Sequence, residues 1–441
     1  MKSINQNRRK EMSRVRFAEQ NHLHLFQNIY TIFLFVSIFT IGFQNVGISQ
    51  SNLDNYLYTG AQNNPGLKAK FSSYHASIEK VPQVGSLPNL NVTFGYFVSP
   101  IETRVGPQQA KLSVSQLFPW FGTLSRTEDV YIQRAKADYE VFEDAKTKLF
   151  FDIKSAYYNL YFVKKGIAIT KENIAILNTF QQLALIKIET GKTSVVDKLR
   201  VDMEVNELEN KLAYLMDSKY TLEVEFHQLI NDSVTTEIIT PDSLWDESLM
   251  LSRESLMDSI VTNNHLIKQI EHKIFSWESQ KIVSKKVGGP QIIVGLDYAF
   301  IGQSDNPSLG NENGKDAIMP MIGISIPLYR KKYTSMVKEA SYNIEANQFE
   351  KENKKNELTI LFERVYRDYT DANRRINLYE RQTKLADKSL NILLTSYSND
   401  GQNFEEVLRM ERKTLDYSLQ LDKARADKNA AVAFIEYLTG K

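Results

Sequence analysis

Apolar residues in the second half of the chain recur at alternating spacings of four and three, which is the pattern of a coiled-coil seam. The series is Leu358, Phe362, Val365, Tyr369, Ala372, Ile376, Tyr379, Thr383, Ala386, Leu390, Leu393 and Tyr397. Subtracting 209 from each position gives a matching series in the first half: Leu149, Ile153, Ala156, Leu160, Val163, Ile167, Thr170, Ile174, Leu177, Gln181, Ala184 and Ile188. Only Thr170, Gln181 and Thr383 are polar. The chain therefore contains a twofold internal repeat whose halves are in register.

The seam resumes after a short break in each half, at the same offset. The first-half series is Leu208, Leu212, Leu215, Lys219, Leu222, Phe226 and Leu229, and the second is Tyr417, Leu421, Ala424, Lys428, Ala431, Ile435 and Leu438. These patterns predict two helical hairpins: 129–188 with 195–230, and 337–397 with 404–438. At about 1.5 Å per residue, the longer helices would each span about 90 Å. We therefore expect an elongated structure rather than a compact globular domain.

The repeat also divides the chain into segments. We predict a first structural repeat over 51–231, a connecting segment over 232–251 and a second structural repeat over 252–441. The connecting segment is polar and contains Pro241, which is typical of mixed, irregular structure. Helices over 52–82 and 252–286 are predicted to open the two repeats and to complete the helical bundle.

Each half also carries two segments in which apolar residues alternate with small or polar ones. The predicted strands cover 89–100, 109–119, 290–300 and 318–329. Their aligned apolar residues include Leu90, Val92, Phe94, Tyr96, Ala110, Leu112, Val114, Ile292, Val294, Leu296, Tyr298, Phe300, Ile322, Ile324 and Ile326. Strands of about 10 residues with one apolar face are typical of a tilted membrane-spanning strand. A soluble sandwich sheet with one face towards a core is the alternative.

A sheet of four strands cannot stand alone in a membrane, because its open edges would leave backbone groups unsatisfied in lipid. If the sheet is in a membrane, several chains must share one barrel. Three chains would supply about 12 strands, which is wide enough for a water-filled lumen. The joining segments 101–108 and 301–317 are rich in Gly, Pro and Asn and are expected to be external loops.

Both halves pass from strand to helix through an aromatic and proline-containing junction. In the first half, Pro119 lacks a donor and should end the strand, and Gly122 should let the chain turn into the helix. Trp120 and Phe121 stand where aromatic side chains anchor at a lipid–water interface. In the second half, Pro327 and Tyr329 occupy the corresponding places.

Composition narrows the class of protein further. The chain has 441 residues, 42% hydrophobic and 24% charged, and no cysteine, which excludes disulfides, thiolate chemistry and lipidation on cysteine. Basic residues precede an apolar run at 29–43, so residues 1–50 are predicted to be a secretory signal peptide. An uncleaved anchor helix is the alternative. The mature chain then carries a net charge near −3, which gives nucleic acid no basic surface to bind.

No catalytic or metal-binding pattern is present. Ser-His-Asp order, a phosphate loop and HExxH are all absent, and the acidic residues are spread along helical faces, so we expect no enzyme and no cofactor. The mature chain contains only four histidines, without a close pair, so a stable metal site is not expected: His75, His227, His265 and His272.

The paired hairpins, the twofold repeat, the strands and the signal peptide together resemble the TolC family of outer membrane efflux proteins. The matching stretches are NNPGLKA at 63–69, SQLFPWFG at 115–122, GKTSVVDKL at 191–199 and ISIPLY at 324–329. The resemblance covers essentially the whole mature chain. It implies an α+β membrane protein: a trimeric 12-stranded outer-membrane β-barrel, four strands per chain, continued into the periplasm by an α-helical coiled-coil barrel.

The same resemblance implies a passive channel-tunnel of a tripartite efflux system. Its partners would be outer-membrane lipid, a periplasmic adaptor protein and an inner-membrane pump of the resistance-nodulation-division type. The motif FPWFG is most similar to that of the branch of the family that exports heavy metals and small molecules. The sequence itself identifies neither the cargo nor the cognate pump.

In that family the hairpin tips close the periplasmic aperture, and a carboxylate follows the tip glycine by six residues. Gly191 and Asp197 match this pattern, and the repeat offset assigns Asp400 and Glu406 to the second tip, with the glycine displaced to Gly401. A trimer would then present six carboxylates around one aperture, and acidic rings favour cations. The alternative for each carboxylate is a solvated acid at a helix start, which the helix dipole favours.

Two other classes of protein remain open from the sequence. A structural or adhesive coiled-coil surface protein would explain the heptads, but not the strands or the repeated junction. A periplasmic adaptor also combines a hairpin with strands, but it would contain one hairpin instead of a duplicated pair.

Overall fold

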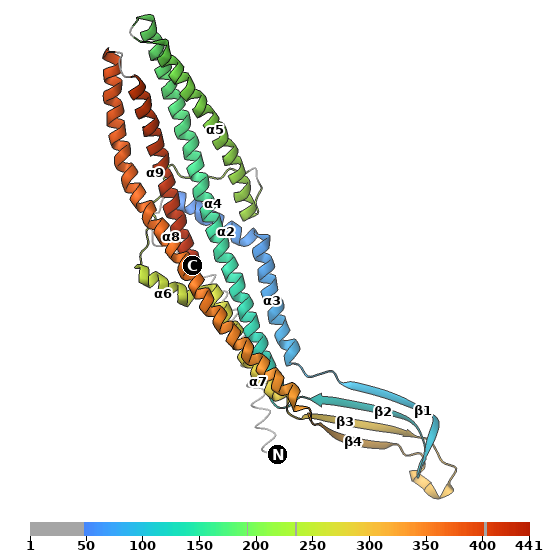
Figure 1. Cartoon of the computed structure of the whole chain (residues 1–441). Coiled ribbons are helices and arrows are strands. Elements are labelled where there is room, and N and C mark those ends of the chain that lie inside the picture. Colours follow the sequence, from blue (N-terminus) through green and yellow to red (C-terminus); the bar gives the residue numbers. More distant parts are fainter. Residues whose placement is uncertain (1–47, 192, 234–235, 401–403) are drawn as a thin grey trace. The chain divides into compact units, whose positions relative to one another are not determined.

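The computed structural model describes residues 48–441 except 192, 234–235 and 401–403 (Figure 1). The chain divides into two units, Met1–Asp54 and Asn55–Lys441. In the first unit only the start of helix α2 (Ile48–Asn63) is described. The apolar run at 29–43 and nearly all of the predicted signal peptide 1–50 lie outside the described residues. No described helix combines the length and the apolarity that a membrane crossing requires.

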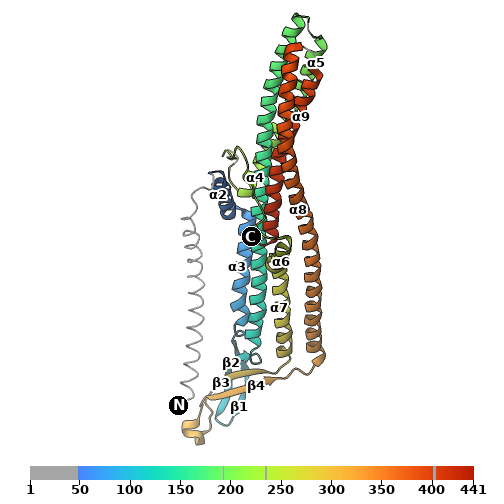
Figure 2. The same cartoon turned by 90° about the vertical axis from the view of Figure 1, so that its left-hand side faces the viewer.

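The second unit contains the two predicted helical hairpins. Helix α4 (Thr123–Glu189) pairs with α5 (Val195–Ile230), and α8 (Arg330–Asp400) pairs with α9 (Phe404–Leu438) (Figures 1 and 2). With 67 and 71 residues, α4 and α8 are each about 100 Å long. None of the 24 long-helix seam residues is exposed. The heptad prediction is therefore confirmed.

Both long helices begin earlier than the heptads indicate. Helix α4 starts directly after Gly122, six residues before the predicted position 129, and α8 starts directly after Tyr329 instead of at position 337. The seam pattern detects only the part of a helix that packs against its partner. The first turns continue beyond that part, because no residue between the junction and the seam breaks a helix.

Helix α9 carries a second buried stripe in addition to its seam with α8. Phe404, Leu408, Leu415 and Leu419 belong to one apolar cluster with residues from the other hairpin, namely Leu177, Phe180, Val201 and Leu208. A second cluster near the other end of α9 joins Leu256, Ile260, Ile267, Leu358, Phe362, Ile435 and Leu438. The two hairpins are therefore packed against each other, through α4 and α9, along the tip-proximal half of the bundle.

Each predicted opening helix is in fact two helices. The first is broken at Asn64, between α2 and α3 (Pro65–Gly85), and the second at Asn264, between α6 (Arg253–Asn263) and α7 (His265–Val287). Pro65 disfavours helical backbone in the residue before it. Asn264 has the same extended backbone, with ψ of 128°, without a following proline. The predictions of single helices over 52–82 and 252–286 were therefore wrong.

Both asparagines make the same pair of contacts. Asn64 Oδ1 accepts from the Leu67 amide at 3.0 Å and its Nδ2 donates to the Leu229 carbonyl at 2.9 Å. Asn264 Oδ1 accepts from the Leu266 amide at 3.0 Å, and its Nδ2 donates to the Leu438 carbonyl at 3.0 Å. Leu229 and Leu438 are related by the offset of 209. In each half, one side chain thus caps a helix and binds the end of the returning helix.

Replacing Asn264 by alanine is expected to lower the free energy of unfolding by about 2 kcal/mol, because it removes both a helix cap and a buried hydrogen bond. Asn264 is 1% exposed, whereas the preceding Asn263 is exposed. Asn263→Ala is therefore the matched control and should change stability by less than about 0.5 kcal/mol. Thermal unfolding of the purified protein in detergent measures both. Equal effects of the two variants would show that the two hydrogen bonds of the Asn264 side chain do not stabilise the protein.

The connecting segment 232–251 has neither helix nor strand among its described residues. It is held by side chains of the long helices: Lys164 Nζ donates to the Ile238 carbonyl at 2.5 Å, and Asn429 Nδ2 to the Trp245 carbonyl at 3.0 Å. Lys428, the lysine that interrupts the α9 seam, forms an ion pair with Asp246. The lysine in the α9 seam therefore binds the connecting segment to this helix.

The four strands form one antiparallel sheet in the order β1-β2-β3-β4, comprising β1 (Asn91–Thr103), β2 (Gly106–Phe118), β3 (Gln291–Ile301) and β4 (Ala317–Ser325). The register places Phe94 opposite Leu112, Leu112 opposite Tyr298, and Tyr298 opposite Ile318. Even-numbered positions of the regularly paired segments therefore share one face across all four strands, and this face is apolar and largely exposed, with Ile322 80% exposed. The predicted apolar faces are confirmed and align with one another.

The opposite face of the sheet is more polar, although Leu117, Ile293, Met319 and Met321 also lie on it. It carries Thr93, Ser113 and Ser115, and an ion pair between Lys111 and Asp297. Strands β1 and β4 are the two edges, and each pairs with one neighbour within the chain.

The predicted bounds of the hairpin loops need correction. The segment 101–108 is almost entirely strand, with a turn only at Arg104 and Val105, because β1 and β2 stay paired beyond Pro100. The second loop contains a 3-10 helix, η1 (Pro307–Glu312). Strand β4 ends at Ser325, four residues before the predicted position 329.

Candidate functional site

The first hairpin tip is a tight reversal centred on Gly191. Helix α4 ends at Glu189, Thr190 caps it, and Gly191 has a φ of +68°. A side chain would be strained at this positive φ, so glycine permits the turn. Ser194 then begins the return, because its Oγ accepts a hydrogen bond from the Val196 amide at 3.2 Å.

Asp197, the predicted aperture carboxylate, lies in the first turn of α5, where the helix dipole favours a negative charge. Its side chain is 13% exposed. Thr193 Oγ1 donates a hydrogen bond to it, and a guanidinium nitrogen of Arg200 lies 3.5 Å from Oδ1. The carboxylate is therefore held by residues of its own tip.

The second tip is described only at its two ends. Asp400 is the last residue of α8, and the predicted Gly401 lies outside the described residues. Glu406 lies in the first turn of α9 and forms an ion pair with Arg409. Asp197 and Glu406 thus occupy equivalent places in their helices, while the turn geometry at Asp400 and Gly401 stays a prediction.

The sequence reasoning missed the arginine that accompanies each carboxylate. Arg200 and Arg409 each follow their acidic partner by three residues, and they are themselves related by the offset of 209. Applying the offset to basic residues would have found them. A ring built from these tips would therefore contain arginines beside its acids, not acids alone.

Two ion pairs connect the first hairpin to the second near the tips. Arg200 lies 3.0 Å from Glu405, and Arg412 binds Glu204 through two nitrogens, one at 3.2 Å. Because Glu405 is 71% and Arg412 64% exposed, each pair contributes only about 0–1 kcal/mol. These two ion pairs orient the tips but contribute little to the stability of the contact between the hairpins.

Below the tips lies a buried contact between α4 and α8. Lys187 Nζ donates to the Ser398 carbonyl at 3.1 Å and lies 4.8 Å from the ring centroid of Tyr397. Burial raises the pKa of the Tyr397 hydroxyl, and the charge of Asp197 raises it further. This contact joins the two hairpins where both side chains are out of water.

The first strand-to-helix junction has the predicted geometry. Strand β2 ends at Phe118, directly before Pro119. Gly122 has a φ of +74°, which turns the chain into α4. Phe121 is 73% exposed and its carbonyl accepts a hydrogen bond from Lys286 Nζ of α7 at 3.0 Å.

A close approach to Gly289 fixes the indole at this junction. A Cβ added at Gly289 would lie 2.8 Å from Trp120 Cγ, which only glycine avoids. Trp120 itself is 38% exposed, so one side of its ring packs on the turn between α7 and β3 while the rest faces outwards. The sequence reasoning did not identify this partner, although the adjacent pair Gly288 and Gly289 marks a turn.

The second junction differs from the first. Strand β4 ends two residues before Pro327, so this proline does not itself terminate the ladder. Tyr329 is 88% exposed, and α8 begins at Arg330, where the first half has glycine. An Arg330 guanidinium nitrogen lies 3.5 Å from the Gly288 carbonyl oxygen. Both junctions therefore contact the same α7–β3 turn.

Two of the predicted histidines, His265 and His272, make separate local contacts. His265 Nδ1 lies 2.7 Å from Glu140 and His272 Nδ1 lies 3.0 Å from Gln133. Within the described part of the chain, no group of three His, Asp or Glu side chains is arranged to hold a metal ion.

No protein-family model and no curated protein matches the sequence. Solved structures of outer-membrane channels do share its fold. The channel-forming protein CusC is 14% identical with a TM-score of 0.72, and the alignment covers 91% of this chain and 95% of that one. The open-state MtrE outer membrane channel of Neisseria gonorrhoeae is 13% identical with a TM-score of 0.72, covering 88% and 89%.

The outer membrane protein VceC of Vibrio cholerae is 13% identical with a TM-score of 0.71, and the alignment covers 88% of this chain and 96% of that one. At these identities the likeness establishes the fold. The fold predicted from the repeat, the hairpins and the strands is therefore confirmed: the chain has the fold of outer-membrane channel proteins.

Proposed function

We propose that the chain is one protomer of a homotrimeric outer-membrane channel that extends into the periplasm and conducts its cargo passively. Three copies would place 12 strands in one barrel and continue it with a barrel of helical hairpins. The channel would receive small molecules or metal ions from an inner-membrane pump of the resistance-nodulation-division type, through a periplasmic adaptor.

This proposal rests on the four-stranded sheet, which has one apolar face and two edge strands that each lack a neighbour on one side. An exposed apolar face on all four strands fits lipid, and the polar face with Lys111 and Asp297 fits a water-filled lumen. In a membrane, the unpaired backbone N–H and C=O groups of the edge strands β1 and β4 need hydrogen-bond partners. Further copies of the chain would supply them. The exposed Trp120, Phe121 and Tyr329 at the strand ends suit a lipid–water interface.

The hairpin tips lie at the end of the unit away from the sheet (Figures 1 and 2). With the strands in the outer membrane, the tips would reach into the periplasm, where an adaptor and a pump are accessible. Two hairpins per chain also favour the channel over an adaptor, which needs only one. In a trimer Asp197 and Glu406 would line the aperture together with Arg200 and Arg409.

Ion preference in planar bilayers tests this aperture. The purified protein should form discrete channels, since three chains enclose a lumen. The double variant Arg200→Ala/Arg409→Ala should increase cation over anion permeability several-fold, because it leaves Asp197, Glu405 and Glu406 of all three chains without their arginine partners. Asp197→Ala/Glu406→Ala should shift the preference towards anions by the opposite charge effect.

Matched controls are Lys70→Ala and Glu79→Ala on α3, where both residues are exposed and distant in sequence from the tips. These should leave the ion preference unchanged. If the two double variants share one ion preference, the tips do not line the aperture. If no channels form at all, the proposed conduction is wrong.

A further inference from the structure

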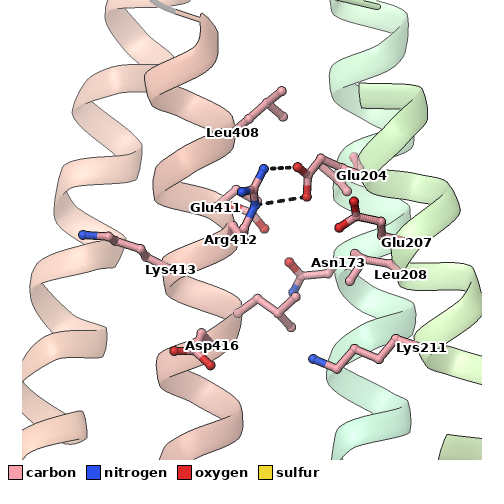
Figure 3. A pocket seen from close by; sticks show the side chains of 12 residues that line it. Asn173, Glu204, Glu207, Leu208, Lys211, Leu408, Glu411, Arg412, Lys413 and Asp416 are labelled. Carbon is pink, nitrogen blue, oxygen red and sulfur yellow. Dashed lines mark hydrogen bonds and ion pairs between the residues drawn. The ribbon is translucent and has the colours of Figure 1, made fainter. Parts of the chain in front are cut away.

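A cavity of about 430 Å³ lies between α4, α5 and α9 in the tip-proximal half of the hairpins (Figure 3). Much of its wall is apolar and comes from three different helices: Leu177, Leu208, Leu408 and Leu415. A volume of this size is in the range of small-molecule sites. The cavity therefore has room for a ligand with an alkyl part.

Glu411 lies in the wall of this cavity, on the second buried stripe of α9. Its side chain is 3% exposed, and Oε2 has no hydrogen-bond partner among the described residues. Nearby Arg412 does not compensate it, because this guanidinium is engaged by Glu204 (Figure 3). A buried carboxylate without a partner is unfavourable in free energy when it is charged. Either a proton or a positively charged group would relieve this penalty.

The surrounding charges do not supply that positive charge. Burial, together with the negative charges of Asp387 and Glu172, raises the pKa of Glu411 to about 7. The charged groups around it on the packed helices are Glu172 of α4, Glu204, Glu207 and Lys211 of α5, Asp387 of α8, and Arg412, Lys413 and Asp416 of α9. Neither Lys211 nor Lys413 forms an ion pair with Glu411 within the described chain.

The chemistry of the wall selects the class of cation. A divalent metal ion needs several oxygen or nitrogen ligands, and the described residues here offer no group of three. An ammonium group needs one buried acceptor, and leucines suit an attached alkyl chain. We propose that this cavity binds a small organic ammonium ion, with its nitrogen on Glu411 and its alkyl chain on the leucines.

Isothermal titration calorimetry of the full-length protein in detergent with butylammonium chloride tests the proposal. We expect saturable binding at pH 8, at least tenfold weaker in Glu411→Gln, which keeps the shape of the side chain and removes its charge. Because the ammonium ion competes with a proton, binding to the native protein should weaken about tenfold between pH 8 and pH 6. The exposed rim variant Glu207→Gln should keep the native affinity within about twofold.

Butan-1-ol, the uncharged analogue, should bind the native protein at least tenfold more weakly, and this comparison does not depend on how a variant folds. Absence of saturable binding, equal binding of butan-1-ol, or unchanged binding to Glu411→Gln would overturn the proposal. The site is independent of the proposed transport role, because binding is measured on the purified protein whether or not it conducts ions.

Discussion

Replacing Val114 by arginine is expected to abolish assembly of the protein in the outer membrane, whereas Ser115→Arg should be tolerated. Val114 lies opposite Val92 on β1 and Leu296 on β3, in the apolar face of the sheet. An arginine on a lipid-facing strand position costs about 2–4 kcal/mol near the middle of a bilayer. In a trimer the cost is incurred three times, about 6 kcal/mol or more per assembly.

Ser115 is the matched control because it lies on the same strand, one residue further on, and on the opposite face. Its arginines would point into the proposed water-filled lumen. Membrane fractionation followed by electrophoresis without heating measures assembly as the amount of heat-resistant oligomer. Equal loss of oligomer in both variants, or in neither, would contradict the assignment of the two faces.

Replacing Glu411 by glutamine is expected to stabilise the protein by about 2 kcal/mol at pH 8 and to change little at pH 4. Burial raises the pKa of this carboxyl from 4.5 to about 7. Below pH 4.5 the group is protonated in both the folded and the unfolded protein, so it has no pH-dependent effect. Between pH 4.5 and 7 the folded protein retains a proton that the unfolded chain loses, and stability falls as pH rises.

Above pH 7 the full penalty of the buried charge is present, and glutamine avoids it. Urea unfolding in detergent at pH 4 and pH 8, without added amine, measures the difference. Glu207→Gln in the same cavity wall is the control, since its side chain is exposed and should show no such pH dependence. A Glu411→Gln effect that is the same at both pH values would contradict the linkage.

The helical part of the fold was predictable because a heptad seam is a long-range pattern that few other structures produce. The repeat offset then predicted where both hairpins lie, and the apolar residues at even-numbered positions predicted which face of each strand is apolar. Local breaks were not predictable in this way. Asn64 and Asn264 interrupt their helices through side-chain contacts with Leu229 and Leu438, which are distant in sequence.

The site was predictable only in outline. The tip glycine Gly191 and the helix-start position of Asp197 follow from local rules, whereas the pairing of Arg200 with Glu405 depends on how the two hairpins approach each other. Glu411 was missed for a related reason. A heptad seam describes one face of each helix, but α9 has a second buried stripe in which Glu411 stands between Leu408 and Leu415.

We propose that three copies of the chain close one barrel around a lumen. Electron cryomicroscopy of the full-length protein, extracted from outer membranes in detergent, tests it most directly. We expect threefold-symmetric particles with a central lumen bounded by 12 strands, each β1 edge paired with the β4 edge of the neighbouring chain. A monomeric particle, or a closed ring with a number of copies other than three, would contradict it.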